Sequence, residues 1–240
     1  CRMESSAWNA GYVSSGVYNT ISYSTITSSA LGAAALTVWR ASWTTLSHSY
    51  AFNPSDHGAL FAHAYLTTVE SSTMVSSAAN FAGAFLWNSS SNTLRDSLVL
   101  NSAGRAISLS SAHHNLVLRS TTAGGASAAY ALQLDTATFN SISESYIANP
   151  GGHGALFAAG ANSNTVSGST LTSAGTGYGL RISGAYNTVS ASRIRSAGIG
   201  GNANLILRST ITSEDSEGLF VDGSSPTIAN CYVQGASTGA

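Results

Sequence analysis

The feature that most constrains this chain is an internal repeat of about 24 residues. Apolar anchor residues recur along the 240 residues at intervals of 22 to 25 residues, apart from one interval of 17. These anchors are Ile21, Leu46, Val69, Leu94, Val117, Ile142, Val166, Val189, Ile206 and Ile228. Around each anchor, apolar and polar residues alternate with a period of two, which is the period of a β-strand. One copy is too short to bury its own apolar face, so the copies must stack on one another.

Polar residues keep the same register as the anchors. A serine stands three residues after nine of the ten anchors, and an asparagine stands two residues before seven of them. The serines are Ser24, Ser49, Ser72, Ser97, Ser120, Ser145, Ser169, Ser192 and Ser209. Polar side chains at the turns of successive coils can hydrogen-bond one another and the backbone. We therefore predict a structural serine ladder along the stack.

A second alternating apolar pair lies seven to ten residues before most anchors, and turns rich in Gly, Ser and Asn separate the runs. Each copy therefore holds about three short strands. The chain is predicted to be all-β, a single-stranded parallel β-helix of about ten coils that forms one domain over residues 1–240. The 17-residue interval between Val189 and Ile206 predicts a coil from which a loop is deleted around residues 198–201.

The repeated frame of Asn, Thr and an apolar residue, as in Asn164-Thr165-Val166, resembles the pectate-lyase-like right-handed parallel β-helix family. It is most similar to the repeats of bacterial surface β-helix proteins. The resemblance covers essentially all of the chain and implies a right-handed solenoid, which the spacing alone does not fix. The chain differs from the family pattern in placing serine where the family often has asparagine in the turn.

The composition argues against several classes of function. Charged residues make up 8% of the chain, the nine basic residues are all arginine, and the net charge is −1. This balance argues against binding to nucleic acid or to an anionic membrane surface, because both need clustered positive charge. No stretch approaches the roughly 18 consecutive apolar residues of a membrane-spanning helix, so we expect no transmembrane segment.

The charged and titratable residues do not predict a catalytic centre. Asp96, Arg119 and Glu144 lie two residues after their anchors in three consecutive copies, so their charges alternate and are expected to neutralise one another. Near-identical segments surround His57 and His153, which are 96 residues apart, and we interpret them as a duplicated turn. Four coils would separate these two imidazoles too widely to share a metal ion. We predict no catalytic residues, no metal site and no cofactor.

Large side chains in positions expected to face outward predict a contact surface. Four residues after the anchors, Thr alternates with Tyr or another large residue, and phenylalanines fall between pairs expected to face inward. Such exposed apolar columns could stack on sugar rings or on a neighbouring β-helix, unless a long loop folds over them. The candidate contact residues are Phe61, Leu86, Phe157, Phe220, Tyr50, Tyr146, Tyr232, Trp39 and Trp87.

Two function hypotheses follow from these features. The first is a non-catalytic structural or adhesive module of an extracellular bacterial fibre or cell-surface protein. The alternative is a carbohydrate-binding or polysaccharide-processing protein, of lyase or hydrolase type, that uses exposed aromatic residues. The ends carry no cap-like repeat, so we expect an excerpt or a subunit of a longer assembly. Cys1 and Cys231 fall in the serine column at opposite ends, which predicts a head-to-tail contact between copies; lateral self-association is the other arrangement.

Overall fold

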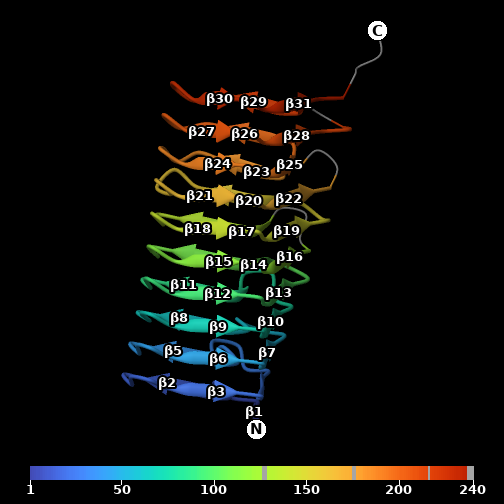
Figure 1. Ribbon diagram of the computed structural model, residues 1–240. Helices are drawn as coiled ribbons and strands as arrows, with labels where there is room; N and C mark the ends of the chain where they lie inside the picture. Colours follow the sequence, from blue (N-terminus) through green and yellow to red (C-terminus); the bar gives the residue numbers. More distant parts are fainter. Residues whose placement is uncertain (126–128, 175–176, 216, 237–240) are drawn as a thin grey trace.

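The computed structural model describes residues 1–125, 129–174, 177–215 and 217–236, and within these ranges the chain is a parallel β-solenoid without helices (Figure 1). Three sheets run along the solenoid axis, and each coil contributes one strand to each sheet. Every strand pairs in parallel with the equivalent strand one coil away, as Ile21 does with Leu46. The predicted architecture, an all-β solenoid of about ten three-stranded coils, is confirmed.

The strands of the three sheets are as follows, in spatial order. Sheet A comprises β1 (Arg2–Ser5), β4 (Thr25–Ser28), β7 (Tyr50–Asn53), β10 (Thr73–Ser76), β13 (Leu98–Asn101), β16 (Thr121–Gly124), β19 (Tyr146–Asn149), β22 (Thr170–Ser173), β25 (Arg193–Arg195), β28 (Thr210–Thr212) and β31 (Tyr232–Gln234). Sheet B comprises β2 (Gly11–Ser14), β5 (Leu36–Trp39), β8 (Ala59–Ala62), β11 (Ala82–Trp87), β14 (Arg105–Ser110), β17 (Tyr130–Asp135), β20 (His153–Phe157), β23 (Leu180–Ile182), β26 (Ala197–Ile199) and β29 (Leu219–Val221). Sheet C comprises β3 (Thr20–Ser22), β6 (Thr45–Ser47), β9 (Thr68–Glu70), β12 (Thr93–Arg95), β15 (Leu116–Leu118), β18 (Ser141–Ser143), β21 (Thr165–Ser167), β24 (Thr188–Ser190), β27 (Leu205–Leu207) and β30 (Thr227–Ala229).

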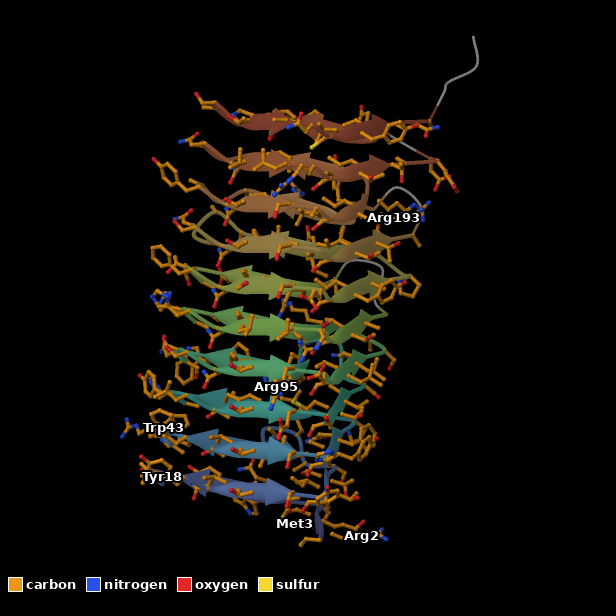
Figure 2. All side chains as sticks on the ribbon, in the orientation of Figure 1. Arg2, Met3, Tyr18, Trp43, Arg95 and Arg193 are labelled. Carbon is orange, nitrogen blue, oxygen red and sulfur yellow. The ribbon has the colours of Figure 1, made fainter. Side chains whose placement is uncertain are left out.

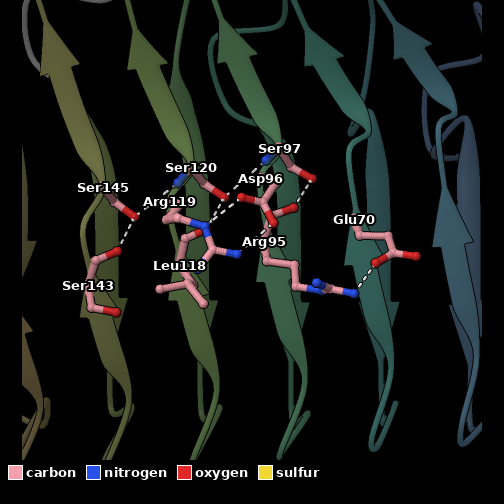
Figure 3. Close-up of polar contacts among 9 residues, drawn as sticks. All are labelled: Glu70, Arg95, Asp96, Ser97, Leu118, Arg119, Ser120, Ser143 and Ser145. Atoms are coloured by element: carbon pink, nitrogen blue, oxygen red, sulfur yellow. Dashed lines mark hydrogen bonds and ion pairs between the residues drawn. The ribbon is translucent and has the colours of Figure 1, made fainter.

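The serine column closes the corner between sheets C and A. The residue before each serine takes a left-handed conformation, as Arg119 does with a φ of 43°, and this conformation is unfavourable for residues with a Cβ. The serine supports the corner: the Ser120 hydroxyl donates to the Leu118 carbonyl at 2.9 Å and accepts the Ser97 N–H at 3.2 Å. Figure 3 shows Ser97, Ser120 and Ser145 in three successive coils. The ladder is buried and links neighbouring coils.

A ladder of asparagine side chains lies at the corner between sheets B and C. The Asn140 side-chain oxygen accepts both the backbone N–H and the side-chain amide of Asn115, at 2.9 and 3.0 Å. The Asn140 amide donates in turn to the Ala112 carbonyl at 2.9 Å. Because each buried amide is satisfied in this way, the ladder fixes the corner instead of destabilising it. The members of this ladder are Asn92, Asn115, Asn140, Asn164, Asn187 and Asn204.

The interior is filled by apolar columns, and sheet B corrects part of the prediction. Phe61, Leu86 and Phe157 were expected to point outward, but they are only 3%, 8% and 0% exposed. They belong to one inward column, in which Phe61 pairs with Leu86 and Phe157 pairs with Leu134. The prediction assigned inward and outward positions one residue away from their true places in runs such as residues 59–62. In these runs apolar residues follow one another without alternation, so the pattern does not distinguish the two faces. A slip of one residue exchanges the two faces of a strand.

The short coil also differs from the expectation. Only Ser196 connects β25 to β26, whereas three to seven residues make the equivalent connection from sheet A to sheet B in every other coil. The missing residues therefore belong to this corner, and the predicted deletion around residues 198–201 is wrong. Gly198 and Ile199 lie inside β26.

Candidate functional site

A cleft of about 280 Å³ opens on sheet B where the short coil passes between its longer neighbours. Its floor is the backbone of the short coil, and its sides come from β23, β29 and the residues next to them. The residues that line it are Tyr178, Arg181, Ile182, Ser183, Gly198, Gly200, Gly201, Phe220 and Asp222. Two aromatic rings, one guanidinium and one carboxylate thus converge on a floor of small residues.

Glycines in the floor of this cleft leave room for its walls. A Cβ on Gly198 would lie 3.3 Å from the Tyr178 ring, and a Cβ on Gly200 would lie 2.8 Å from the Asp222 carboxylate. A side chain at either position would therefore push the ring or the carboxylate away from the backbone of the floor. In the outward column of sheet B, Gly198 lies between Arg181 and Phe220, so the column is hollowed between two large side chains.

An imidazole holds the aromatic wall of the cleft in place. The Nδ1 atom of His153 accepts the backbone N–H of Tyr178 at 3.0 Å, and the two rings stack with centroids 6.2 Å apart. Tyr130 stacks on the other side of His153 at 4.8 Å. Burial lowers the pKa of His153, and the positive charge of Arg181 lowers it further. A neutral imidazole whose Nδ1 is an acceptor carries its proton on Nε2.

His57 has the same role in the duplicated turn, four coils away. Its Nδ1 accepts the Ala82 N–H at 2.8 Å, and its ring contacts Phe81 and Phe85. Burial lowers the pKa of His57, while the neighbouring Asp56 opposes that shift. Both histidines therefore cap the backbone of the next coil. Over the described ranges, no group of three or more His, Cys, Asp or Glu side chains is arranged to hold a metal ion.

A second hollow, a groove of about 330 Å³, lies on sheet A on the other side of the Ser196 corner. Arg193 projects outward here from β25 (Figure 2). Arg195 is held in place, because it donates to the Ser173 carbonyl at 2.7 Å and forms an ion pair with Asp215. The groove is lined by Tyr146, Thr170, Leu171, Thr172, Arg193, Arg195, Thr212 and Glu214.

The predicted contact residues divide into two exposed groups. Tyr50, Tyr146 and Tyr232 share an outward column of sheet A and are 37%, 47% and 59% exposed, respectively. Trp39 and Trp87 meet over sheet B with ring centroids 6.2 Å apart. Phe220 lies elsewhere, in the wall of the cleft, and is 43% exposed.

The tryptophan pair is completed by residues that the pattern did not single out. His63 contacts both rings, at 5.4 Å from Trp39 and 5.0 Å from Trp87. The Arg40 guanidinium lies 5.6 Å from the Trp39 ring. Together these side chains form an aromatic cluster at the end of β5, β8 and β11.

The alternating charges form pairs along the solenoid (Figure 3). Arg119 binds both carboxylate oxygens of Asp96, at 2.8 and 2.9 Å, and Arg95 pairs with Glu70 in the neighbouring coil. The hydrogen bond from Arg119 lowers the pKa of the Asp96 carboxyl. Exposed pairs of this kind contribute little to stability. Glu144, the third member of the predicted alternation, forms no ion pair among the residues that the structure describes.

Cys1 directly precedes β1 and Cys231 directly precedes β31, the first and last strands of sheet A, which lie at opposite ends of the solenoid (Figure 1). Cys1 is exposed, and Cys231 is half-buried with its thiol against the Ile206 and Ala229 carbonyls. Both are free thiols. A head-to-tail contact that brings them together between copies stays a prediction. The described residues include no helix long and apolar enough to cross a membrane.

Sequence patterns alone did not predict the cleft on sheet B. Tyr178, Arg181 and Asp222 come from two different coils, and their positions follow from the length of the corner between them. The one available signal was the 17-residue interval, which marks the coil that forms the floor. Irregularities in a repeat are places where neighbouring loops can form a site.

Solved structures that share this fold come from several functional classes. The periplasmic alginate epimerase AlgG is 9% identical, with a TM-score of 0.59 over 92% of this chain and 74% of that one. The catalytic domain of a GH87 α-1,3-glucanase is 12% identical, with a TM-score of 0.58 over 98% of this chain and 60% of that one. The Streptococcus pneumoniae surface protein and adhesin PfbA is 9% identical, with a TM-score of 0.56 over 93% and 68%. At such identities the likeness shows the fold alone.

These comparisons contradict the prediction that the chain is not an enzyme, because an epimerase and a glucanase are among the structures that share its fold. No curated protein matches the chain in sequence. The family described as "right handed beta helix region" matches residues 34–194, which is more than half of the chain. The description of this family agrees with the predicted right-handed winding of the solenoid. The chain therefore belongs to the right-handed β-helix family.

Proposed function

We propose that this protein binds and processes an acidic polysaccharide in the cleft on sheet B. The observation that carries the proposal is the convergence of Tyr178, Phe220, Arg181 and Asp222 on a glycine floor. Aromatic faces suit the apolar faces of sugar rings. A guanidinium suits a carboxylate, which it can bind through two parallel hydrogen bonds. The enzymatic relatives, one of alginate and one of α-1,3-glucan, support processing over binding alone.

The groups in the cleft favour removal of the proton next to a uronate carboxylate. Arg181 would stabilise the negative charge that develops on the substrate carboxylate. Asp222, the one carboxylate among the residues that line the cleft, would accept the proton as general base. The resulting carbanion either takes a proton from water on the other face, or forms a double bond by expelling the neighbouring glycosidic oxygen, which leaves as a hydroxyl after taking a proton from water. Hydrolysis is less well supported, because it uses a pair of carboxylates.

An extracellular or cell-surface location belongs to this proposal. Two proteins of this fold support it, because AlgG is periplasmic and PfbA is a surface protein by their names. Self-association along the axis is compatible with a cleft on the side of the solenoid.

Incubation with uronate polymers and with neutral glucans tests the proposal. Unsaturated ends report elimination, and incorporation of solvent deuterium reports epimerisation. We expect Asp222→Asn to slow turnover by about 100-fold or more, which is the usual contribution of a general base. Asp135→Asn is the matched control, because Asp135 follows Leu134 as Asp222 follows Val221 in the register of sheet B, and β17 lies two coils before β23 in the wall of the cleft. Absence of turnover on every uronate polymer, or full activity of Asp222→Asn, would contradict the proposal.

A further inference from the structure

An outward column on sheet A has a symmetrical sequence centred on the short coil. The column crosses five neighbouring strands of sheet A, which are β19, β22, β25, β28 and β31. Its residues, in register, are Tyr146, Thr170, Arg193, Thr210 and Tyr232. The order is therefore aromatic, hydroxyl, guanidinium, hydroxyl, aromatic. Successive members lie one strand spacing apart, about 4.8 Å, so the two tyrosines are about 19 Å apart.

The adjacent outward column provides more hydroxyl groups. Two residues further along the same five strands stand the buried Ala148, followed by Thr172, Arg195, Thr212 and Gln234. Each of the strands β22 and β28 thus presents two threonines, on either side of two arginines on β25. The groove of about 330 Å³ described above lies over this array.

The central guanidinium is available to a ligand. Arg193 is exposed, and its side chain has no ion-pair partner among the residues that the structure describes. Arg195 is already engaged by Ser173 and Asp215. Glu214 is the one carboxylate in the lining of the groove. An exposed, unpaired guanidinium between threonine hydroxyls offers the hydrogen-bond donors that an anionic, hydroxyl-rich ligand requires.

We propose that this array, which we name the sheet A track, is a second binding site for an anionic glycan laid along the solenoid axis. One sugar unit of an extended glycan is similar in length to one strand spacing, so about five units match the five strands. A carboxylate or sulfate binds Arg193, sugar hydroxyls bind Thr170 and Thr210, and Tyr146 and Tyr232 stack on rings at the two ends. The inference rests on the proposed function only for the class of ligand.

The strands of sheet A that precede the track present a more apolar outward surface, so the track does not continue toward the amino terminus. The strands β7, β10 and β13 place Tyr50, Phe52, Val75, Leu98 and Leu100 outward, with no charged residue among them in these two columns. Tyr146 is thus the last aromatic residue before the polar array begins. Since the cleft and the track adjoin the same short coil, a polymer held on the track raises the local concentration of substrate at the cleft.

Binding of a labelled five-unit uronate oligosaccharide, a sulfated one and a neutral glucan of equal length tests the track. We expect Arg193→Gln to weaken binding of the anionic ligands by about tenfold, as loss of a charge-assisted hydrogen bond does. Raised salt should weaken wild-type binding as well. Tyr146→Ala should weaken it and Tyr146→Phe should not. Arg40→Gln, on the distant tryptophan cluster, is the control for net charge.

Several outcomes decide between the two sites. Unchanged affinity of Arg193→Gln, or equal binding of the neutral glucan, overturns the track. Uronate and sulfate are distinguished by which oligosaccharide shows the larger effect of Arg193→Gln. If the wild type turns over no polymer but binds through Arg193, the track stands and the proposed processing fails. If turnover requires Asp222 but binding ignores Arg193, the track fails alone.

Discussion

At the scale of single residues, the hydroxyl groups of the ladder serines serve as both hydrogen-bond donors and acceptors. From Ser49 to Ser209, each hydroxyl donates to the carbonyl two residues before it and accepts the N–H of the serine in the preceding coil, as Ser120 does with Leu118 and Ser97. The sequence predicted this column because the serines keep a constant distance from the anchors. It did not predict the left-handed residue before each serine, since that position holds residues as different as Tyr23, Asp96 and Arg208.

Ser120→Ala tests the ladder. The substitution removes the acceptor of a buried N–H and leaves it unsatisfied, so we expect the free energy of unfolding to fall by about 1–3 kcal/mol. Ser143→Ala is the control, because the Ser143 side chain faces outward from sheet C and we expect a change within about 0.5 kcal/mol. Urea unfolding measures both. Equal effects would show that the hydroxyl does not connect the coils.

The capping histidines predict a loss of stability in acid. The pKa of His57 is lowered in the folded protein by burial, so below the ordinary value of about 6.5 the unfolded chain binds more protons. Stability is therefore complete above that pH and falls as the pH decreases toward the lower pKa of the folded state. His57→Asn keeps an acceptor for the Ala82 N–H but does not titrate. Thermal unfolding between pH 7.5 and 5 should show a smaller decrease for the variant, and an identical decrease would contradict this account.

At the scale of the strands, the pattern predicted sheets A and C better than sheet B. In sheet C, residues such as Val166 stand between polar neighbours, so alternation fixes which face is inward. In sheet B, alanine and large apolar residues follow one another, as in Ala59–Ala62, and both frames satisfy the pattern. Only the volume available inside the solenoid decides that Phe61 and Phe157 fill the core.

Phe157→Ala tests the corrected register. Phe157 is 0% exposed and pairs in register with Leu134 and Ile182, so its truncation leaves a cavity and should cost about 3–5 kcal/mol. Phe220→Ala is the matched control, because its ring lies on the outward face and is 43% exposed. We expect a cost of roughly 1 kcal/mol or less there. If denaturation shows only a small decrease in the free energy of unfolding for Phe157→Ala, Phe157 faces outward and the corrected register is wrong.

At the scale of the whole molecule, function is expected where the repeat is broken. The regular coils differ in sequence but present continuous columns, whereas the coil that contains Ser196 places glycines along the cleft and arginines along the groove on sheet A. The interval of 17 residues located this coil in the sequence. The composition of the two hollows could not be inferred, because it depends on loops of the adjacent coils that only the folded chain brings together.

Arg195 connects the three coils around this break, and this leads to a prediction about how far a disturbance spreads. Its guanidinium joins the Ser173 carbonyl in the preceding coil to Asp215 in the following one. Because the pair is partly exposed, Arg195→Gln should cost only about 1 kcal/mol, which corresponds to roughly fivefold faster amide exchange. In a solenoid each coil contacts only its neighbours, so the change should be confined to residues near β22 to β29. Hydrogen–deuterium exchange resolved along the chain measures this, with β5 to β14 as the internal control. An equal increase in those distant strands would show instead that the solenoid opens as one cooperative unit.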